Sequence, residues 1–358
     1  MLFHLLYPFY KEITFFNVFK YITFRSFVAF ALATIISIVW GKYFIRYMKL
    51  KQFGQTIRDD GPESHFKKRG TPTLGGVFII GSVIMSLLWT GNFLSNALLG
   101  AVFVMISYFI LGWYDDYLKI IKKNSDGVSA KGKLLWQFVT SALVMVFFIK
   151  FEVISTELYL PFFKDKIIDL GNWYVLFGSF VIVGSSNAVN LTDGLDGLVT
   201  GPVITSAATL GFLAYLAGHF ELANYLLIPY TEGVGELTVL CACIAGASVG
   251  FLWYNCNPAQ IFMGDVGSLS LGGVLGTIAV LTKNEFLFVI IGGIFVMEAI
   301  SVILQVGSFK LRGKRIFKMA PIHHHFELLG WPEPKVIVRF WILSIGFSIL
   351  ALATLKLR

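Results

Sequence analysis

Ten apolar segments, separated by short polar stretches, constrain the fold of this chain more than any other feature of its sequence. A helix needs about 20 apolar residues to cross the roughly 30 Å of hydrocarbon in a bilayer. We place the segments near residues 20–41, 74–92, 96–114, 134–152, 172–188, 198–217, 237–254, 267–282, 286–307 and 337–355. The sequence therefore predicts about ten transmembrane helices.

The composition excludes an ordinary soluble domain. Hydrophobic residues make up 56% of the 358 residues and charged residues only 14%, whereas soluble domains carry about 25% charged residues. Transmembrane strands would alternate apolar and polar residues, and these segments do not. We find no repeat or low-complexity segment, so residues 1–358 are expected to form one all-α integral-membrane domain. No secretory signal is recognisable, so the first span itself is expected to direct insertion.

The distribution of Lys and Arg predicts the orientation of the chain in the membrane. The loops 42–71, 115–133 and 308–339 hold 20 of the 29 Lys and Arg residues. Because cytoplasmic loops are enriched in these residues, we expect the three loops in the cytoplasm and both termini in the periplasm. Loops 189–197 and 255–266 then also face the cytoplasm. The net charge of +8 comes from residues that flank spans, which indicates contact with the membrane surface and no nucleic-acid binding.

Two neighbouring aspartates close the third apolar segment. Asp115 and Asp116 lie at the expected membrane boundary, where their charges repel each other unless a cation or a proton compensates them. A Mg²⁺ site is one solution, and a solvated acidic helix end followed by Lys119 is the alternative. On a helix the two side chains point about 100° apart, so one could bind metal while the other acts as a base.

The loop after the fifth segment reads NLTDGLDG from Asn190. Asp193 and Asp196 would share one face of a helix, and each precedes a glycine that permits a tight turn. The free N–H groups of the next helix would be available to an anion or a polar sugar. A plain Asx and glycine turn is the alternative interpretation.

The loop after the seventh segment carries Asn255, Phe262 and Asp265. Asp265 lies between glycines at the expected start of the eighth helix, a position that suits a metal-bound phosphate. An ordinary helix N-cap is the alternative. Phe262 could stack on a base or anchor the loop at the membrane interface.

Three consecutive histidines, His323 to His325, lie in the last cytoplasmic loop among several basic residues. Three neighbours on a regular helix or strand cannot all bind one ion, so phosphate contact and hydrogen bonding fit them better than a zinc centre. The stretch 59–73 adds lysines, which ordinary membrane anchoring would also explain. Glu298 and Gln305 in the ninth segment are costly in lipid and are expected to face the bundle interior or a cavity.

These polar clusters come from five loops that are expected on one membrane face. Together they predict a site for a multiply phosphorylated, polar substrate with a divalent metal. Because the chemistry of such a chain lies at the membrane interface, a lipid is the expected co-substrate. An ion-coupled transporter is the rival from another class, but transport sites lie near the bilayer midplane and these residues cluster at one surface.

Several strings resemble those of the bacterial phospho-N-acetylmuramoyl-pentapeptide transferase family, within the polyprenyl-phosphate N-acetylhexosamine-1-phosphate transferase superfamily. They are YDD from Tyr114, NLTDGLDGL from Asn190, FMGDVGSLSLGG from Phe262, MAPIHHHFE from Met319, GPESHFKKRGTPTLGG from Gly61, SVILQVGSFKLRGKRIFKMAPIHHH from Ser301 and GWPEPKVIVRFW from Gly330. The likeness covers essentially the whole chain, without a departure at a motif position. The histidine string distinguishes this family from other members of the superfamily.

The resemblance implies transfer of phospho-MurNAc-pentapeptide from UDP-MurNAc-pentapeptide to undecaprenyl phosphate, giving lipid I and UMP, with Mg²⁺ required. This reaction is the first membrane step of peptidoglycan synthesis, in the bacterial inner membrane, and family members are homodimers and targets of nucleoside antibiotics. By the same resemblance Asp115, Asp116 and Asp265 are the catalytic and metal-associated residues, and we assign His324 a catalytic role. The matching residues of the nucleotide-sugar pocket are Lys68, Thr73, Asn190, Asp193, Asp196, Asn255, Phe262, Gln305, His323 and His325.

Phosphoryl transfer needs charge neutralisation and in-line positioning more than covalent help from the protein. We expect Asp265, with Asp115 or Asp116, to hold Mg²⁺ at the donor pyrophosphate, and Asp115 to deprotonate or orient the lipid phosphate. Direct attack is simpler than an aspartyl-phosphate intermediate. A related transferase that uses UDP-GlcNAc is the alternative within the superfamily, and the histidine string argues against it.

Overall fold

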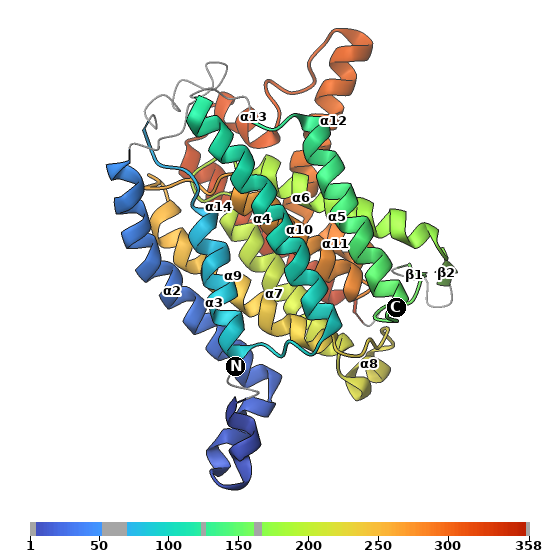
Figure 1. Cartoon of the computed structure of the whole chain (residues 1–358). Coiled ribbons are helices and arrows are strands. Elements are labelled where there is room, and N and C mark those ends of the chain that lie inside the picture. The colour runs from blue at the N-terminus through green and yellow to red at the C-terminus, as the bar shows by residue number, and fades with distance from the viewer. Residues whose placement is uncertain (1–4, 52–69, 123–126, 161–166, 356–358) are drawn as a thin grey trace.

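The computed structural model describes residues 5–51, 70–122, 127–160 and 167–355, which form a bundle of helices (Figure 1). The long helices are α2 (Ile22–Leu50), α3 (Gly76–Thr90), α4 (Asn96–Lys122), α5 (Ala130–Lys150), α6 (Trp173–Thr192), α7 (Thr200–Ala217), α9 (Leu237–Asn255), α10 (Asp265–Leu281), α12 (Gly293–Arg312) and α14 (Glu333–Ala353). The short elements are η1 (Tyr7–Lys11), η2 (Thr14–Lys20), η4 (Val234–Glu236), α8 (Phe220–Leu226), α11 (Glu285–Ile291), α13 (Ile322–Leu328) and an antiparallel hairpin of β1 (Glu157–Tyr159) and β2 (Ile167–Asp169).

The predicted all-α polytopic membrane fold is confirmed. Among the described residues, eight helices are long and apolar enough to cross a bilayer, and α3 and α10 are shorter apolar helices. These ten helices correspond in order to the ten apolar segments of the sequence. Helix α2 begins and helix α14 ends at the end of the bundle that carries the β1–β2 hairpin (Figure 1). The assignment of that end to the periplasm stays a prediction.

Helix α10 is the centre of the bundle. All of its residues except Asp265 are buried, so this helix meets protein on every side and does not need the length of a lipid-facing span. Glycines let its neighbours approach, since a Cβ on Gly272 would lie 2.7 Å from the carbonyl oxygen of Ser185 on α6. Serine hydroxyls complete the contacts, as when Ser185 donates to the carbonyl of Gly272 at 2.7 Å. This packing fixes the first turn of α10 beside the ends of α4 and α6.

The ninth apolar segment differs from the prediction of one continuous span over 286–307. The chain forms α11 and α12, with Gly292 between them at φ −85° and ψ 24°. A Cβ on the next residue, Gly293, would lie 2.6 Å from the ring of Phe347 on α14, so the absence of a side chain there lets α14 approach the break. Helix α12 then extends from the bundle toward the end that carries α13 (Figure 1).

Candidate active site

Three aspartates meet where α4 ends and α10 begins. Asp115 and Asp116 lie in the last turns of α4, and Asp265 is the first residue of α10. Each offers a carboxylate oxygen, and these oxygens lie within 4.8 Å of one another. Two glycines make the approach possible. A Cβ on Gly112 would lie 2.3 Å from the carbonyl oxygen of Asp265, and a Cβ on Gly264 would lie 2.4 Å from Oδ2 of Asp116.

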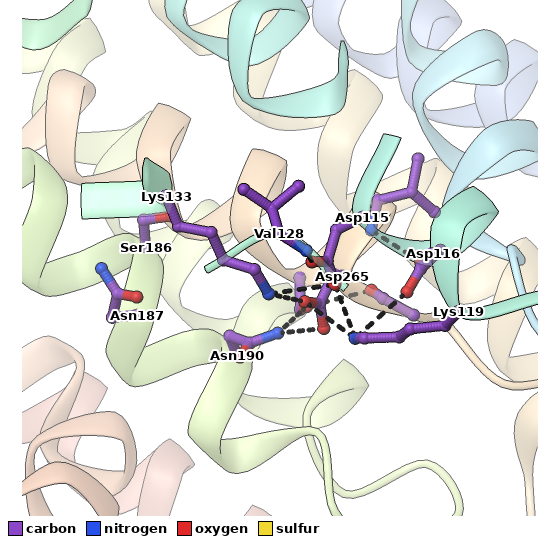
Figure 2. A network of polar contacts seen from close by, with 12 residues as sticks. Asp115, Asp116, Lys119, Val128, Lys133, Ser186, Asn187, Asn190 and Asp265 are labelled. Carbon is purple, nitrogen blue, oxygen red and sulfur yellow. Dashed lines mark hydrogen bonds and ion pairs between the residues drawn. The ribbon is translucent and has the colours of Figure 1, made fainter. Parts of the chain in front are cut away.

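Two lysines share this acidic cluster (Figure 2). Nζ of Lys119 lies 2.6 Å from Asp115 and 3.2 Å from Asp265, and it also lies 3.7 Å from Asp116. Nζ of Lys133, from the first turn of α5, lies 3.0 Å from Asp115 and 2.7 Å from Asp265. Both ammonium groups therefore bridge the same two carboxylates, which come from different helices.

Neutral donors orient each carboxylate. The backbone N–H of Val128 donates to Asp115 at 2.6 Å, and the N–H of Val266 donates to Asp116 at 3.1 Å. Nδ2 of Asn190 donates to Asp265 at 2.9 Å. The carboxylates are thus held in fixed directions before any ligand binds, which lowers the reorganisation that binding requires.

The charge and chemistry of this cluster fit a divalent cation. The three aspartates outnumber the two lysines, so full ionisation of the cluster leaves one negative charge without a counter-charge in a buried setting. Carboxylate oxygens are the ligands that Mg²⁺ prefers, usually one or two of them together with phosphate oxygens. Asp115 and Asp116 are 0% and 5% exposed, and such burial makes uncompensated negative charge costly. A metal ion with the phosphates of a substrate would complete this cluster.

The loop that follows α6 lies against the acidic cluster. The carboxylate of Asp193 lies close to the backbone N–H of Gly264, the residue before Asp265. Burial and then the charge of Asp265 raise the pKa of Asp193 to about 7. Asp196 accepts from the N–H of Ala259 at 3.0 Å and from Asn257 at 3.3 Å. Asp196 therefore holds the loop 193–197 against the loop 255–264, and Asp193 lies at the same contact.

The segment before α3 also reaches the cluster. Phe262 pairs its backbone with this segment, because its N–H donates to the carbonyl of Pro72 at 2.9 Å and its carbonyl accepts the N–H of Gly75 at 2.8 Å. The hydroxyl of buried Thr73 lies 3.1 Å from the place where a Cβ on Gly264 would be. The predicted pocket residue Lys68 lies outside the described residues.

Two other predicted pocket residues hold loops of the chain itself. Asn255, which is buried, donates to the carbonyl of Ile261 at 2.9 Å. Gln305 on α12 accepts the N–H groups of Ile316 and Phe317, both at 3.0 Å. These amides shape the loops that surround the acidic cluster, whatever further contacts they make with a ligand.

The three histidines point to three different partners. Nδ1 of His323 lies 3.1 Å from Glu298 in the bundle interior. Nδ1 of His324 lies 2.8 Å from Glu327, and Nδ1 of His325 accepts the N–H of Lys318 at 3.1 Å. None of these contacts resembles a shared metal site, which agrees with the sequence-based preference for hydrogen bonding.

The sequence interpretation missed the two lysines and Ser268. Asp115 and Lys119 are four residues apart in a helix, a spacing that brings opposite charges together and could have signalled the first pair. Lys133 carried no local signal, because only the packing of α5 against α4 brings it to the aspartates. Ser268 accepts from Asn190 at 2.8 Å one turn after Asp265.

Comparison with known proteins assigns the chain to a family. Residues 98–283 match the model of glycosyl transferase family 4. The phospho-N-acetylmuramoyl-pentapeptide-transferases of Citrifermentans bemidjiense and of a Geobacter species (strain M21) are each 54% identical to this chain, and that of Pelobacter propionicus is 53% identical. Each alignment covers 100% of both chains. The chain belongs to the phospho-N-acetylmuramoyl-pentapeptide-transferase family.

The resemblance noted in the sequence is therefore confirmed at the level of the family. The part matched by the glycosyl transferase family 4 model begins in α4 and ends just after α10. This transferase core contains all three clustered aspartates, both lysines and Asn190. The histidines and Glu298 lie outside it, in the C-terminal part that the full-length relatives also cover.

Proposed function

We propose that this member of the phospho-N-acetylmuramoyl-pentapeptide-transferase family transfers phospho-MurNAc-pentapeptide from UDP-MurNAc-pentapeptide to undecaprenyl phosphate, releasing UMP and forming lipid I. The observation that supports this most directly is the cluster of Asp115, Asp116 and Asp265 at the ends of membrane-spanning helices. Such a position gives access both to a water-soluble nucleotide and to a lipid headgroup.

Mg²⁺ is the cofactor that fits the acidic cluster. Asp265, together with Asp115 or Asp116, would hold the ion. Bound there, Mg²⁺ would neutralise charge on the donor pyrophosphate and on the leaving UMP. Val128, Val266 and Asn190 keep the carboxylates oriented through the hydrogen bonds described above.

Lys119 and Lys133 are suited to bind the phosphate groups that approach this cluster. Each ammonium already contacts at least two carboxylates, and phosphate oxygens can take the place of one of them. A phosphate monoester carries about −1.5 to −2 charges at pH 7. Most acceptor molecules are therefore already deprotonated and need no general base. We therefore assign Asp115, which lies between both lysines, mainly to orient the lipid phosphate for attack on the phosphorus attached to the sugar.

The attack is proposed to be direct. An aspartyl-phosphate intermediate would require a carboxylate that is free to approach phosphorus, whereas hydrogen bonds and lysines hold all three aspartates. Incubation with donor labelled in its sugar phosphate, in the absence of acceptor lipid, tests this point. We expect no labelled protein, and a stable labelled adduct would establish the two-step route.

The location of the site in the cell follows from the charge distribution. The Lys-rich stretch 115–133 itself contains Asp115 and Asp116, so the positive-inside rule supports a cytoplasmic site in the bacterial inner membrane. It stays a prediction that residues 1–358 form one transferase domain. The homodimer also stays a prediction.

An assay of UMP release tests the proposed function. Purified protein in detergent with undecaprenyl phosphate and Mg²⁺ is expected to release UMP from UDP-MurNAc-pentapeptide, and to release none after chelation until Mg²⁺ is restored. UDP-GlcNAc in place of the donor is expected to give no product. Activity with UDP-GlcNAc alone would favour the related transferase, and uptake of substrate into vesicles without UMP would favour a transporter.

A substitution at Gly264 tests the geometry without changing any charge. The φ of Gly264 is +77°, a conformation that L residues rarely adopt, and a Cβ there would displace Asp116. We expect Gly264→Ala to lower kcat for UMP release by roughly 100-fold, as small misplacements of catalytic groups do. The control is Gly171→Ala, also at positive φ but with open space around its Cβ. Equal activity of the two variants would contradict the predicted role of Asp116.

A further inference from the structure

Glu298 is a buried carboxylate that the proposed reaction does not yet use. It lies on α12 and is 0% exposed. A carboxylate inside a membrane-spanning bundle is costly unless a partner compensates its charge. Among the described residues, the ionic partner of Glu298 is His323, whose Nδ1 lies 3.1 Å from Oε1 of Glu298.

The partner is equally enclosed. His323 is the second residue of α13 and is 1% exposed. In the described part of the chain, neither nitrogen of the His323 ring and neither carboxylate oxygen of Glu298 makes a hydrogen bond. The 3.1 Å approach of Nδ1 to Oε1 is therefore an electrostatic contact, without hydrogen-bond geometry, between two buried groups.

The opposite edge of the imidazole lies against the loop that follows α6. A Cβ on Gly194 would be 2.2 Å from Nε2 of His323 and 2.7 Å from its Cε1. The loop and the ring are therefore in direct contact, with no space for a side chain between them. Gly194 follows Asp193, whose carboxylate lies close to the N–H of Gly264, the residue before Asp265. A continuous series of contacts thus runs from Glu298 to the acidic cluster.

We propose that Glu298 is a positioning residue for the nucleotide-sugar donor, acting through a buried ion pair with His323 that supports the 193–197 loop beside the acidic cluster. This inference rests on the proposed function, because it assigns Glu298 to the donor side of the same site. The ion pair holds α13 against α12 and presents one edge of the imidazole to Gly194. The loop then keeps Asp193 and Asp196 in place for the donor, whereas the lipid acceptor does not depend on it.

Steady-state kinetics of Glu298→Gln test the proposal. The amide keeps the size of the side chain but removes the carboxylate that faces Nδ1 of His323, so the loop loses its support. We expect the KM for UDP-MurNAc-pentapeptide to rise about tenfold, while the KM for undecaprenyl phosphate stays within about twofold. A smaller folded fraction would lower the apparent kcat and leave both KM values unchanged, so KM separates positioning from stability.

Glu285→Gln is the matched control. Glu285 is also a buried carboxylate, 3% exposed, but it lies just before the ninth apolar segment, at the start of α11. We expect the Glu285→Gln variant to have the same KM for UDP-MurNAc-pentapeptide as the wild-type protein. An unchanged donor KM in Glu298→Gln, or an equal rise in Glu285→Gln, would overturn the inference. Absence of UMP release from the unchanged protein would instead overturn the proposed function.

A second variant approaches the same contact from the loop. Gly194→Ala adds a methyl group against the ring of His323, so it is expected to raise the donor KM by a similar factor. Because both changes act through one contact, the double variant Glu298→Gln with Gly194→Ala should stay within about twofold of the larger single effect. A donor KM near the product of the two single effects, roughly 100-fold, would show that Glu298 does not act through this loop.

Discussion

Asp265→Asn is expected to abolish UMP release, with kcat reduced at least about 1,000-fold, the range seen when a key electrostatic group is removed from an active site. Asparagine can still accept the hydrogen bond from Asn190, so the start of α10 keeps its structure. Its amide cannot balance Lys119 and Lys133, however, and it is a poor Mg²⁺ ligand. The reaction would lose the cation that neutralises the pyrophosphate.

The measurement is UMP release over a range of Mg²⁺ concentrations, with the thermal unfolding midpoint recorded beside it. Asp116→Asn is expected to behave like Asp265→Asn, because the oxygens of both residues belong to one group within 4.8 Å. Glu221→Gln, at an exposed position on α8, is the control and should keep full activity. Retained turnover in both aspartate variants would remove the metal hypothesis.

The apolar pattern predicted the spans because each lipid-facing helix must be apolar over the thickness of the bilayer. The same pattern could not show that α10 is enclosed by its neighbours, since a buried span and a lipid-facing span have similar composition. The break at Gly292 was also hidden, because a glycine inside an apolar run is common in transmembrane helices. Its effect depends on α14, whose Phe347 packs against Gly293.

The candidate site was predictable where its residues are chemically unusual for a membrane boundary. Asp115, Asp116 and Asp265 stood out because buried carboxylates need compensation, and the structure places them together. Lys133 did not stand out, because a lysine next to a span is the ordinary positive-inside residue. The alternatives for Asp115 and Asp116 are also resolved in part. Their carboxylates are buried beside Asp265, so a solvated helix end does not describe them.

The partners of buried polar groups could not be predicted from the sequence, for a related reason. Glu298 was expected to face the interior, and it does. Its pairing with His323 depends on how α13 folds back onto α12, which no local pattern encodes. Asn255 and Gln305 likewise gave a polar signal, but much of their hydrogen-bonding capacity serves the backbone of nearby loops. A polar residue in or beside an apolar segment thus predicts that a polar partner exists, but the sequence does not identify that partner.

Breaking a second buried ion pair, far from the aspartates, is expected to have the largest effect on the stability of the protein. Arg25 on α2 and Glu236 before α9 are 2% and 7% exposed, and their two contacts measure 2.5 and 2.7 Å. Arg25 also donates to the carbonyl of Thr90, and Glu236 accepts the N–H of Asn92 at 3.2 Å. The pair therefore joins α2, the end of α3 and the start of α9.

Glu236→Ala is expected to destabilise the protein by about 3–5 kcal/mol, because it leaves a buried guanidinium without its counter-charge. The measurement is the thermal unfolding midpoint in detergent, combined with UMP release per folded protein. The midpoint should fall markedly, while kcat per folded protein should change little, since the start of α2, which carries Arg25, and the end of α4, which carries Asp115 and Asp116, lie at opposite ends of the bundle (Figure 1).

Replacing both partners separates the value of the ion pair from the cost of breaking it. The double variant Arg25→Met with Glu236→Leu removes both charges, so it should be more stable than Glu236→Leu or Arg25→Met alone. Glu12→Gln, at an exposed position in the segment before α2, is the control and should leave the midpoint unchanged. If the double variant lost the sum of the two single effects, the cost would come from lost packing between α2 and α9 and not from the uncompensated charge.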